Sequence, residues 1–330
     1  MATEALLAVE DLRTEFFTSR GIVKAVNGVS FSVARGELVG IVGETGCGKS
    51  ATIRSIIGLV RPPGRVVAGS ARFESAELIR MPRRKLRAIR GSGIGFVPQN
   101  PFGALNPILS IERQFRNVIR AHESISRPEV RTRALQMLTD VGIPDPERVL
   151  RGHAHELSGG MAQRTVIALS MILGPRLVIA DEPTTGLDVT VQRQILDLIR
   201  DLLEREHSAM LLVTHDLGVV AQYCHRVIVM YAGKVVESGP VTKVFKTPAH
   251  SYTKALLGAI PRPGVDLVTI SGTVPDPINY PVGCPFYDRC PHRSDPRCET
   301  ESPPLTEVSE GHFAASYYHP TRDQSINVGT

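Results

Sequence analysis

One short stretch limits the folds open to this chain more than any other, the segment GETGCGKS at residues 43–50. It has the phosphate-loop spacing, in which a glycine is followed by four residues and then by Gly-Lys-Ser. The apolar run ELVGIVG (37–43) before it is typical of a buried strand, and SATIRSIIGL (50–59) after it is typical of a helix. This order of strand, glycine turn and helix predicts an α/β sheet with a phosphate at the helix N-terminus.

The side chains of this loop have separate expected roles. Gly43, Gly46 and Gly48 let the backbone curl so that its N–H groups face inward. Lys49 would neutralise the β- and γ-phosphates of a nucleotide, and the Ser50 hydroxyl would ligate Mg²⁺. The residues expected to contact the nucleotide here are Gly43, Glu44, Thr45, Gly46, Cys47, Gly48, Lys49, Ser50 and Ala51. A glycine turn with a purely structural role is the alternative interpretation.

Two later apolar runs, RLVIADE (176–182) and AMLLVTHD (209–216), also end in ionisable side chains. In an open parallel sheet, ligands bind beyond the carboxyl ends of the strands, so these ends should surround one crevice. Asp181 is then the expected partner of Mg²⁺, and Glu182 is the base that orients and polarises the attacking water. His215 would contact the γ-phosphate and keep the water and Glu182 in register.

A second anion-binding segment is expected in HELSGGMAQR (155–164). There Ser158, Gly159 and Gly160 begin a helix whose N-terminus suits an anion. By contrast, GSGIG (91–95) lacks the third glycine of a dinucleotide fingerprint and is expected to be a loop. One chain with two phosphate-binding segments needs an explanation.

Helical spacing appears between these two segments, over residues 111–141. Ser126 and Pro128 lie where an N-cap and a first-turn proline belong, so a helical insertion is expected. The first forty residues are expected to form short strands, with Asn27-Gly28 as a turn signal. After about residue 260 the chain becomes rich in proline, glycine and cysteine, which favours a separate appendage.

Composition adds a few limits. The 330 residues are 42% hydrophobic, enough for one large domain or two ordinary ones. The net charge of +5 decides little, and the basic run RMPRRKLRAIR (80–90) favours a solvated helix face over a nucleic-acid site. No stretch offers the roughly 20 apolar residues that span a bilayer, and the start carries acidic residues where a signal peptide would be basic. We therefore expect a cytoplasmic protein that docks on a membrane through a partner.

Six motifs taken together resemble the nucleotide-binding domains of ATP-binding-cassette (ABC) proteins. In order along the chain they are GETGCGKS, Gln99 in FVPQNP, LSGGM, LVIADEP, TTGLD and His215. The resemblance covers about residues 6–260 and implies a P-loop NTPase fold of ABC type. That fold has a RecA-like core, an N-terminal antiparallel β-subdomain and a helical subdomain over about 100–172. The nucleotide-binding domain would span 1–260, and a small irregular cysteine-containing tail would span 261–330.

The same resemblance assigns further residues. It implies that Phe16, or Phe17 in its place, stacks on adenine, and that Gln99 contacts Mg²⁺ and senses the γ-phosphate. Two such domains pair head to tail, and each ATP lies between the phosphate loop of one and the signature of the other. The residues that would reach the neighbour's nucleotide are Ser158, Gly159, Gly160, Met161 and Asp188. The second anion-binding segment therefore serves a dimer.

Three local features resemble one branch of the family, the ATPase subunits of dipeptide and oligopeptide importers. They are PQNPFGALNP, LSGGMAQR, and TPAHSYTKALLGAIP followed by the cysteine-bearing tail, although Ala162, Gly186 and Ser251 depart from the usual pattern. The resemblance implies a second, similar ATPase, two membrane permeases and an extracytoplasmic solute-binding protein, with this chain peripheral on the cytoplasmic side of the inner membrane. Nickel and opine carriers belong to the same branch, so the solute stays open.

Two other classes of ABC protein have sequence features of their own. Soluble ABC ATPases that act on DNA or ribosomes tend to carry long coiled-coil insertions or two cassettes in tandem, and exporters usually fuse the cassette to membrane helices. The sequence has none of these features. We therefore expect no nucleic-acid partner.

Cysteines cluster near the end of the chain, at Cys284, Cys290 and Cys298. Their spacing does not fit the paired Cys-x-x-Cys of zinc ribbons. The importer branch has a fourth cysteine where this chain has Ser316, and it implies a 4Fe–4S cluster whose fourth ligand here would be Ser316 or His312. Zinc and the absence of a metal are the alternatives, with His312, His292 or His319 as further zinc ligands. Cys47 and Cys224 are expected to be packing residues.

Overall fold

The computed structural model describes residues 5–260, 270–293 and 295–318 of the chain. The chain forms two compact units. The first unit holds Arg80–Val213 with Val33–Glu37, and the second holds Leu7–Ser32, Leu38–Ile79 and the described residues from Thr214 onward. Each unit contains parallel strands and helices, which confirms the predicted α/β class.

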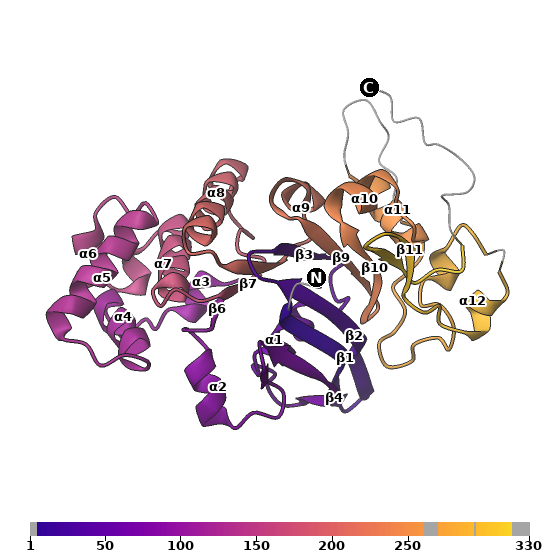
Figure 1. Cartoon of the computed structure of the whole chain (residues 1–330), viewed down its shortest axis with the longest axis horizontal. Coiled ribbons are helices and arrows are strands. Elements are labelled where there is room, and N and C mark those ends of the chain that lie inside the picture. The colour runs from indigo at the N-terminus through magenta and orange to yellow at the C-terminus, as the bar shows by residue number, and fades with distance from the viewer. Residues whose placement is uncertain (1–4, 261–269, 294, 319–330) are drawn as a thin grey trace. The chain divides into compact units, whose positions relative to one another are not determined.

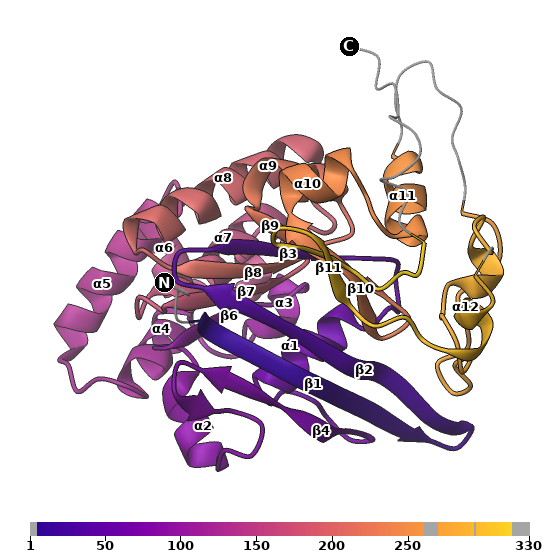
Figure 2. The same cartoon turned by 45° about the vertical axis from the view of Figure 1, so that its right-hand side comes forward.

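Antiparallel strands, most of whose residues belong to the second unit, form one sheet. They are β1 (Ala5–Thr18), β2 (Gly21–Ala34), β4 (Gly64–Phe73) and β5 (Ala76–Glu77), in the order β2-β1-β4-β5 (Figures 1 and 2). The expected turn at Asn27-Gly28 is wrong, because both residues lie inside β2. There the Asn27 side chain accepts a hydrogen bond of 2.9 Å from Arg13 of β1, so a cross-strand contact takes the place of a turn.

The other strands of the second unit carry the phosphate loop. β3 (Leu38–Val42) is buried at every residue and runs parallel to β9 (Arg226–Tyr231), which forms a hairpin with β10 (Lys234–Pro240). The helices of this unit before residue 260 are α1 (Lys49–Ile56), α9 (Leu217–Tyr223), α10 (Val241–Lys246) and α11 (Ser251–Gly258). The loop between β3 and α1 is the predicted GETGCGKS segment, so the expected strand and helix on either side of it are confirmed.

The region expected to be a separate appendage is joined to this sheet. It contains η2 (Tyr287–Arg289), α12 (Arg297–Thr300), β11 (Thr306–Ser309) and β12 (His312–Ala314). β12 pairs antiparallel with β10, and β11 pairs with β12, so the hairpin extends the sheet in the order β11-β12-β10-β9-β3. His312 of β12 is buried, and its Nε2 lies 2.7 Å from Oε1 of the fully buried Glu237 of β10.

Three parallel strands form the centre of the first unit, in the order β8-β7-β6. They are β6 (Ile94–Val97), β7 (Leu177–Asp181) and β8 (Ala209–Val213), and every residue of β7 and β8 is buried. The helices are α2 (Arg83–Ile89), α3 (Pro101–Ala104), α4 (Ile111–Arg120), α5 (Arg127–Asp140), α6 (Pro146–Arg151), η1 (Ala154–Glu156), α7 (Gly159–Met171) and α8 (Val189–Arg205).

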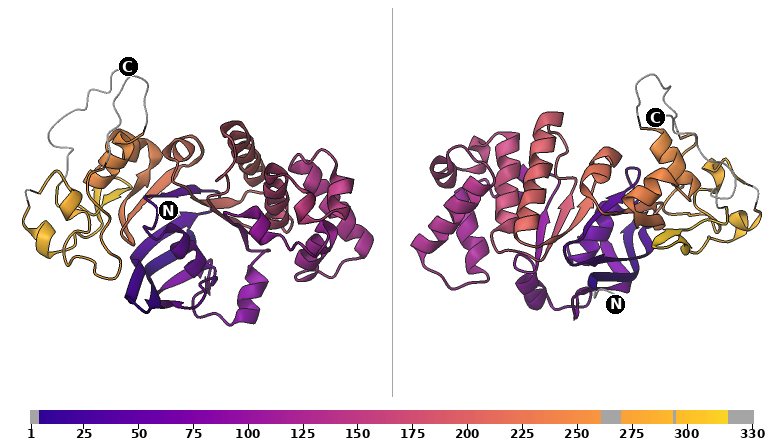
Figure 3. Two further views of the ribbon diagram at one scale, coloured as in Figure 1. Left: turned by 180° about the vertical axis from the view of Figure 1, so that it is seen from behind. Right: turned by 45° about the horizontal axis from the view of Figure 1, so that its top comes forward.

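Helices α4, α5 and α6 pack together, and Figure 3 shows them in magenta from two further sides. The expected start of α5 is confirmed, since the Ser126 side chain accepts a hydrogen bond from the Glu129 N–H and Pro128 lies in the first turn. On α2 only Leu86 is buried, so the basic run at 80–90 is a solvated helix face as expected. Among the described residues, none of the helices has the length and apolar character needed to cross a membrane.

Candidate nucleotide-binding site

The phosphate loop takes a shape that only glycine allows at two of its positions. Gly43 has φ of 150°, and a Cβ there would lie 2.2 Å from the Met230 carbonyl oxygen. Gly48, the N-cap of α1, has φ of 103°, and a Cβ there would lie 2.3 Å from the Ala25 carbonyl oxygen. Any residue other than glycine at these two positions would strain the backbone and would place its Cβ too close to backbone atoms.

Lys49 points back into this loop. Lys49 is only 6% exposed. Its ammonium donates hydrogen bonds to the carbonyl oxygens of Gly43 (2.7 Å) and Glu44 (3.1 Å). A cation held inside a glycine-rich turn at a helix start is an arrangement that suits phosphate. Cys47 is buried in the same loop, and burial raises the pKa of its thiol, which agrees with its expected role in packing.

Glu44 of the loop has partners that sequence reasoning missed. Arg289, from the cysteine-rich region, donates to both Glu44 carboxylate oxygens, at 2.9 and 3.1 Å. The Glu44 backbone N–H donates to the hydroxyl of Tyr252 on α11, at 2.9 Å. The hydrogen bonds to Glu44 raise the pKa of Arg289 above its usual value. No local sequence signal points to the ion pair, because 245 positions separate its members.

The first unit brings two predicted residues together at the end of β7. Asp181 is fully buried, and the next residue, Glu182, adopts a left-handed conformation with φ of 46°. Oε2 of Glu182 accepts a hydrogen bond from Nε2 of Gln99 at 3.0 Å and another from the Thr185 hydroxyl at 2.9 Å. Thr185 was not among the predicted site residues. Its place in the TTGLD segment, three positions after Glu182, is the only signal that could have suggested it.

The signature segment forms an open helix start. Ser158 is the N-cap of α7, its hydroxyl accepts a hydrogen bond of 3.3 Å from the Met161 N–H, and both Ser158 and Gly159 are exposed. Asp188 caps α8 in the same way, by accepting from the Val191 N–H at 3.0 Å, and it is exposed as well. Both helix starts therefore lie on the surface, where another molecule can reach them.

The two phenylalanines expected near adenine differ in their surroundings. Phe16 is half-buried and lies against Gly64, where a Cβ would come within 2.6 Å of its ring. It shares a face of β1 with Thr14, whose hydroxyl lies 2.6 Å from that of Ser55 on α1. Phe17 is 43% exposed and has the Arg65 guanidinium 5.6 Å from its ring centre. The face that carries Phe16 is thus the one that contacts the helix after the phosphate loop.

The two units divide the predicted nucleotide residues between them. The second unit holds Phe16, the loop residues 43–51 and the exposed His215. The first unit holds Gln99, Asp181, Glu182, the signature residues 158–161 and Asp188.

The predicted metal site in the cysteine-rich region is not supported. Burial, with smaller contributions from Cys298 and Cys290, raises the pKa of the Cys284 thiol to about 11. Both expected fourth ligands are engaged elsewhere, since the Ser316 hydroxyl donates to the Tyr318 carbonyl oxygen at 2.6 Å and His312 contacts Glu237. The described residues contain no group of three or more His, Cys, Asp or Glu side chains that could hold a metal ion. His319 lies outside the described residues.

A phosphate loop after a buried strand, a buried aspartate with a neighbouring glutamate after another, and an exposed Ser-Gly-Gly helix start define an ATPase of the ATP-binding-cassette class. Known proteins agree with this class. Residues 26–185 match the family described as ABC transporter, and residues 236–298 match the family described as oligopeptide/dipeptide transporter, C-terminal region.

Relatives match nearly the whole chain. It is 45% identical to the dipeptide transport ATP-binding protein DppD of Bacillus subtilis, over 94% of this chain and 93% of that protein. It is 42% identical to the oligopeptide transport ATP-binding protein OppD of Salmonella typhimurium, over 94% and 93%. The solved dimeric structure of MJ0796, a bacterial ABC transporter cassette, is 27% identical, has a TM-score of 0.64 and covers 71% of this chain and 98% of that one. The chain belongs to the dipeptide and oligopeptide transporter family of ABC ATP-binding subunits, and it is an ATPase.

Proposed function

We propose that this chain powers the import of dipeptides or oligopeptides, working at the cytoplasmic side of the inner membrane. The observation that carries the proposal is the region 236–298, which matches the C-terminal region of oligopeptide and dipeptide transporters. The partners are a second, similar ATPase subunit and two membrane permeases, which an extracytoplasmic solute-binding protein supplies with peptide. We assign 1–260 to the nucleotide-binding domain, with a helical subdomain near 100–172, and 261–330 to the C-terminal region.

The residues of the phosphate loop bind the nucleotide in this proposal. The inward N–H groups of residues 43–51 and the Lys49 ammonium hold the β- and γ-phosphates, and Phe16 stacks on adenine. Ser50, Gln99 and Asp181 provide oxygen atoms that suit Mg²⁺, which neutralises the charge that develops on the phosphates. His215 contacts the γ-phosphate. The buried position of Lys49 and its two bonds to loop carbonyls support this assignment.

Glu182 acts as the base that orients and polarises the attacking water. Its Oε2 already accepts hydrogen bonds from Gln99 and Thr185, so its carboxylate is fixed in one direction. Its N–H donates to the Val213 carbonyl oxygen at 2.8 Å, which holds the backbone in the left-handed conformation. Strained backbone of this kind is concentrated at functional sites, which supports a catalytic role.

A head-to-tail dimer completes each ATP site. The N-terminus of α7 provides Ser158, Gly159, Gly160 and Met161 to the γ-phosphate bound by the partner subunit, because a helix start attracts an anion. Asp188 approaches the same nucleotide. The exposure of both helix starts supports their use between subunits.

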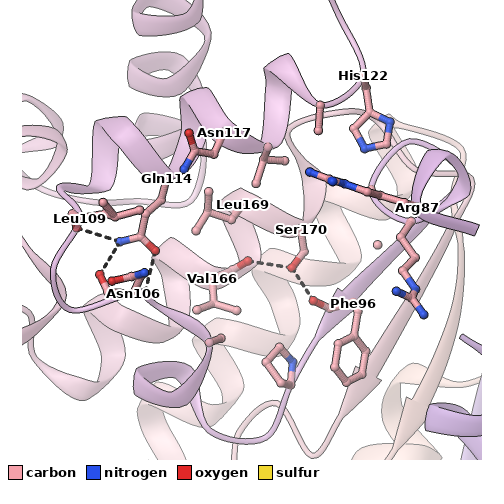
Figure 4. Close-up of a pocket in the computed structure, with 17 residues that line it drawn as sticks. Arg87, Phe96, Asn106, Leu109, Gln114, Asn117, His122, Val166, Leu169 and Ser170 are labelled. Atoms are coloured by element: carbon pink, nitrogen blue, oxygen red, sulfur yellow. Dashed lines mark hydrogen bonds between the residues drawn. The ribbon is translucent and has the colours of Figure 1, made fainter. Parts of the chain in front are cut away.

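A cavity in the first unit suits the docking of a permease segment. Its volume is about 570 Å³, and α2, β6, α4 and α7 line it (Figure 4). Gln114 fixes one wall, since its side chain accepts from the Asn106 N–H and donates to the carbonyl oxygens of Asn106 and Leu109. Pro98 also lines the cavity and directly precedes Gln99. A permease segment bound there would therefore contact the loop that carries a residue of the ATP site.

Co-purification from membranes tests this proposal. The tagged chain is isolated from gently solubilised membranes, and its companions are identified by mass spectrometry. We expect two polytopic permeases and a second ABC ATPase. Asn117→Arg, which adds a large cation in the cavity, should lose the permeases while ATP hydrolysis by the purified chain is retained.

Arg113→Gln on the same helix is the matched control, because Arg113 is exposed and does not line the cavity. It should retain both permeases. Recovery of ribosomal or DNA-bound proteins in place of permeases would show that the transport assignment is wrong. Uptake of labelled dipeptides and oligopeptides, compared with nickel and opines, then identifies the solute.

A further inference from the structure

Glu44 ties the phosphate loop to the C-terminal region. Its carboxylate forms a bidentate ion pair with Arg289, with N–O distances of 2.9 and 3.1 Å. The Arg289 side chain is 5% exposed and that of Glu44 is 24% exposed, so solvent screens this pair less than a surface pair. A bidentate pair also fixes the orientation of the Glu44 carboxylate, which a single hydrogen bond does not.

Arg289 is itself held rigidly. Its remaining N–H groups donate to the carbonyl oxygens of Ser271 (3.0 Å) and Ile270 (3.4 Å) and to the Tyr231 hydroxyl (3.1 Å). Its guanidinium carbon lies 5.7 Å from the ring centre of Tyr231 and 5.8 Å from that of Phe286. The side chain is thus preorganised, and Glu44 binds to a fixed partner.

The backbone of Glu44 is held from the same side. Its N–H donates to the Tyr252 hydroxyl at 2.9 Å, and Tyr252 is fully buried. The Tyr252 ring packs against Tyr231 and Phe286, with ring centres 4.6 and 5.4 Å apart. One aromatic cluster therefore supports both contacts to Glu44. The Glu44 carbonyl in turn accepts from Lys49, which joins Arg289 to the phosphate-binding lysine through a single residue.

The C-terminal region does not depend on Arg289 for its attachment. β12 pairs with β10, His312 contacts the buried Glu237, and the Lys234 ammonium donates to the Ser302 hydroxyl at 2.8 Å. These contacts are independent of the loop. The ion pair between Arg289 and Glu44 is therefore not needed to attach the C-terminal region.

We propose that Arg289 is a positioning residue of the ATP site, which holds the phosphate loop in its nucleotide-binding shape through Glu44. A loop with three glycines in eight residues loses much conformational freedom when it is fixed, and a loop that is already fixed binds its ligand more tightly. The C-terminal region thereby sets the affinity of the chain for ATP. This inference rests on the proposed role of residues 43–51 in binding the phosphates.

A double-mutant cycle tests the inference in the full chain. The Kd of the non-hydrolysable analogue AMP-PNP with Mg²⁺ is measured by calorimetry for Arg289→Met, Glu44→Gln and the double variant. We expect each single variant to weaken binding about tenfold, and the double variant to be no weaker than either, because both remove the same contact. The rate of ATP hydrolysis at saturating ATP should change much less than the Kd in Arg289→Met.

Hydrogen exchange provides the readout that a purely structural role would not change. Amides of residues 43–50 should exchange faster in Arg289→Met, whereas those of β11 and β12 should keep their protection. Arg297→Met is the matched control, because Arg297 lies in the same region and pairs with Asp295 and the Tyr317 ring, away from the loop. It should leave both the Kd and the exchange unchanged. Arg289→Lys, which keeps the charge and loses the bidentate geometry, should give an intermediate Kd and serves if the methionine variant does not fold.

Two outcomes would overturn the inference, an unchanged Kd in Arg289→Met or Arg289→Lys, and additive losses in the double variant. Lys49→Ala separates this failure from failure of the site itself. If Lys49→Ala abolishes AMP-PNP binding while the Arg289 variants bind normally, the ATP site stands and the positioning role is wrong. If Lys49→Ala also binds normally, the phosphate-loop assignment is wrong.

Discussion

At the scale of single residues, Glu182 is held through both its backbone and its side chain. A glutamate with φ of 46° carries backbone strain of about 1–3 kcal/mol, which the surrounding structure must offset. The bond from its N–H to Val213 and the two bonds to its Oε2 do so. The carboxylate is held before any reaction, as a base that orients water needs to be.

We expect Glu182→Gln to lower ATP hydrolysis by about 10²–10⁴-fold, because an amide cannot accept the proton of the attacking water. The Kd for ATP should stay near that of the original chain, since the side chain does not bind the phosphates. Phosphate release and calorimetry measure the two quantities. Thr185→Val removes only one donor to Oε2 and should give a much smaller loss. Normal hydrolysis in Glu182→Gln would refute the assignment of the base.

Sequence patterns identified residues whose roles depend on their neighbours in the chain. The phosphate loop is an example, since its glycines and Lys49 act within a few positions of one another. Arg289 shows the limit of such local sequence patterns. Nothing in CPFYDRCP distinguishes this buried arginine from an exposed one, and its pairing with Glu44 exists only because the C-terminal region lies against the loop.

At the scale of elements, the sequence predicted where helices begin but did not predict which strands pair. Ser126 and Ser158 cap helices where the sequence predicted, because a cap is made within three residues. The turn expected at Asn27-Gly28 was wrong, because pairing with β1 keeps both residues in a strand. β12 was missed for the same reason, since its partner β10 lies more than seventy residues earlier.

Helix α11 carries a pH-dependent element of stability. Its N-cap, His250, is buried, its Nδ1 accepts from the Tyr252 N–H at 3.0 Å, and Glu237 faces it by accepting from the His250 N–H. Burial lowers the pKa of His250 to about 4, although Glu237 opposes this shift. The unfolded chain binds this proton near its ordinary pKa of about 6.5. The contribution of His250 to the stability of the fold is therefore fully present above about pH 6.5, and it is lost as the pH falls toward 4.

We expect His250→Asn to flatten this dependence. Asparagine keeps an oxygen that can cap α11 and has no proton to gain. The free energy of unfolding in urea, measured between pH 7 and 4.5, should fall less steeply in the variant, by roughly 2 kcal/mol over the range. His207→Asn, at an exposed histidine, is the control and should keep the original slope. Equal slopes for His250→Asn and the original chain would contradict the assignment.

At the scale of the whole molecule, the class of protein followed from the order of the motifs, whereas the described residues do not support the metal prediction. Six motifs in order define one fold because each needs the strand or helix that carries it. Three cysteines close in sequence do not define a cluster, because ligands must also be deprotonated and converge on one point. Here the Ser316 hydroxyl donates to the Tyr318 carbonyl oxygen, and His312 contacts Glu237.

In the proposed head-to-tail dimer, the two phosphate-binding segments of one chain serve different ATP sites. Ser158 and Lys49 would then belong to different sites of the assembly, and their substitutions should have opposite effects on the two subunits. This distinguishes a head-to-tail dimer from a chain that uses both segments on one nucleotide. The matched control is Ser126, which caps α5 as Ser158 caps α7.

In the assembled transporter, we expect Ser158→Arg to abolish hydrolysis at the site built on the partner's phosphate loop and to spare the site built on this chain's own loop. Photoreactive 8-azido-ATP trapped with vanadate labels each ATPase subunit according to its turnover, and the two subunits are separated on a gel. Ser158→Arg should remove label from the partner subunit, Lys49→Ala should remove it from this chain, and Ser126→Arg should remove neither. Because the large cation blocks only the anion that α7 faces, loss of label from the Ser158→Arg chain itself would mean that one chain uses both of its phosphate-binding segments on the same ATP.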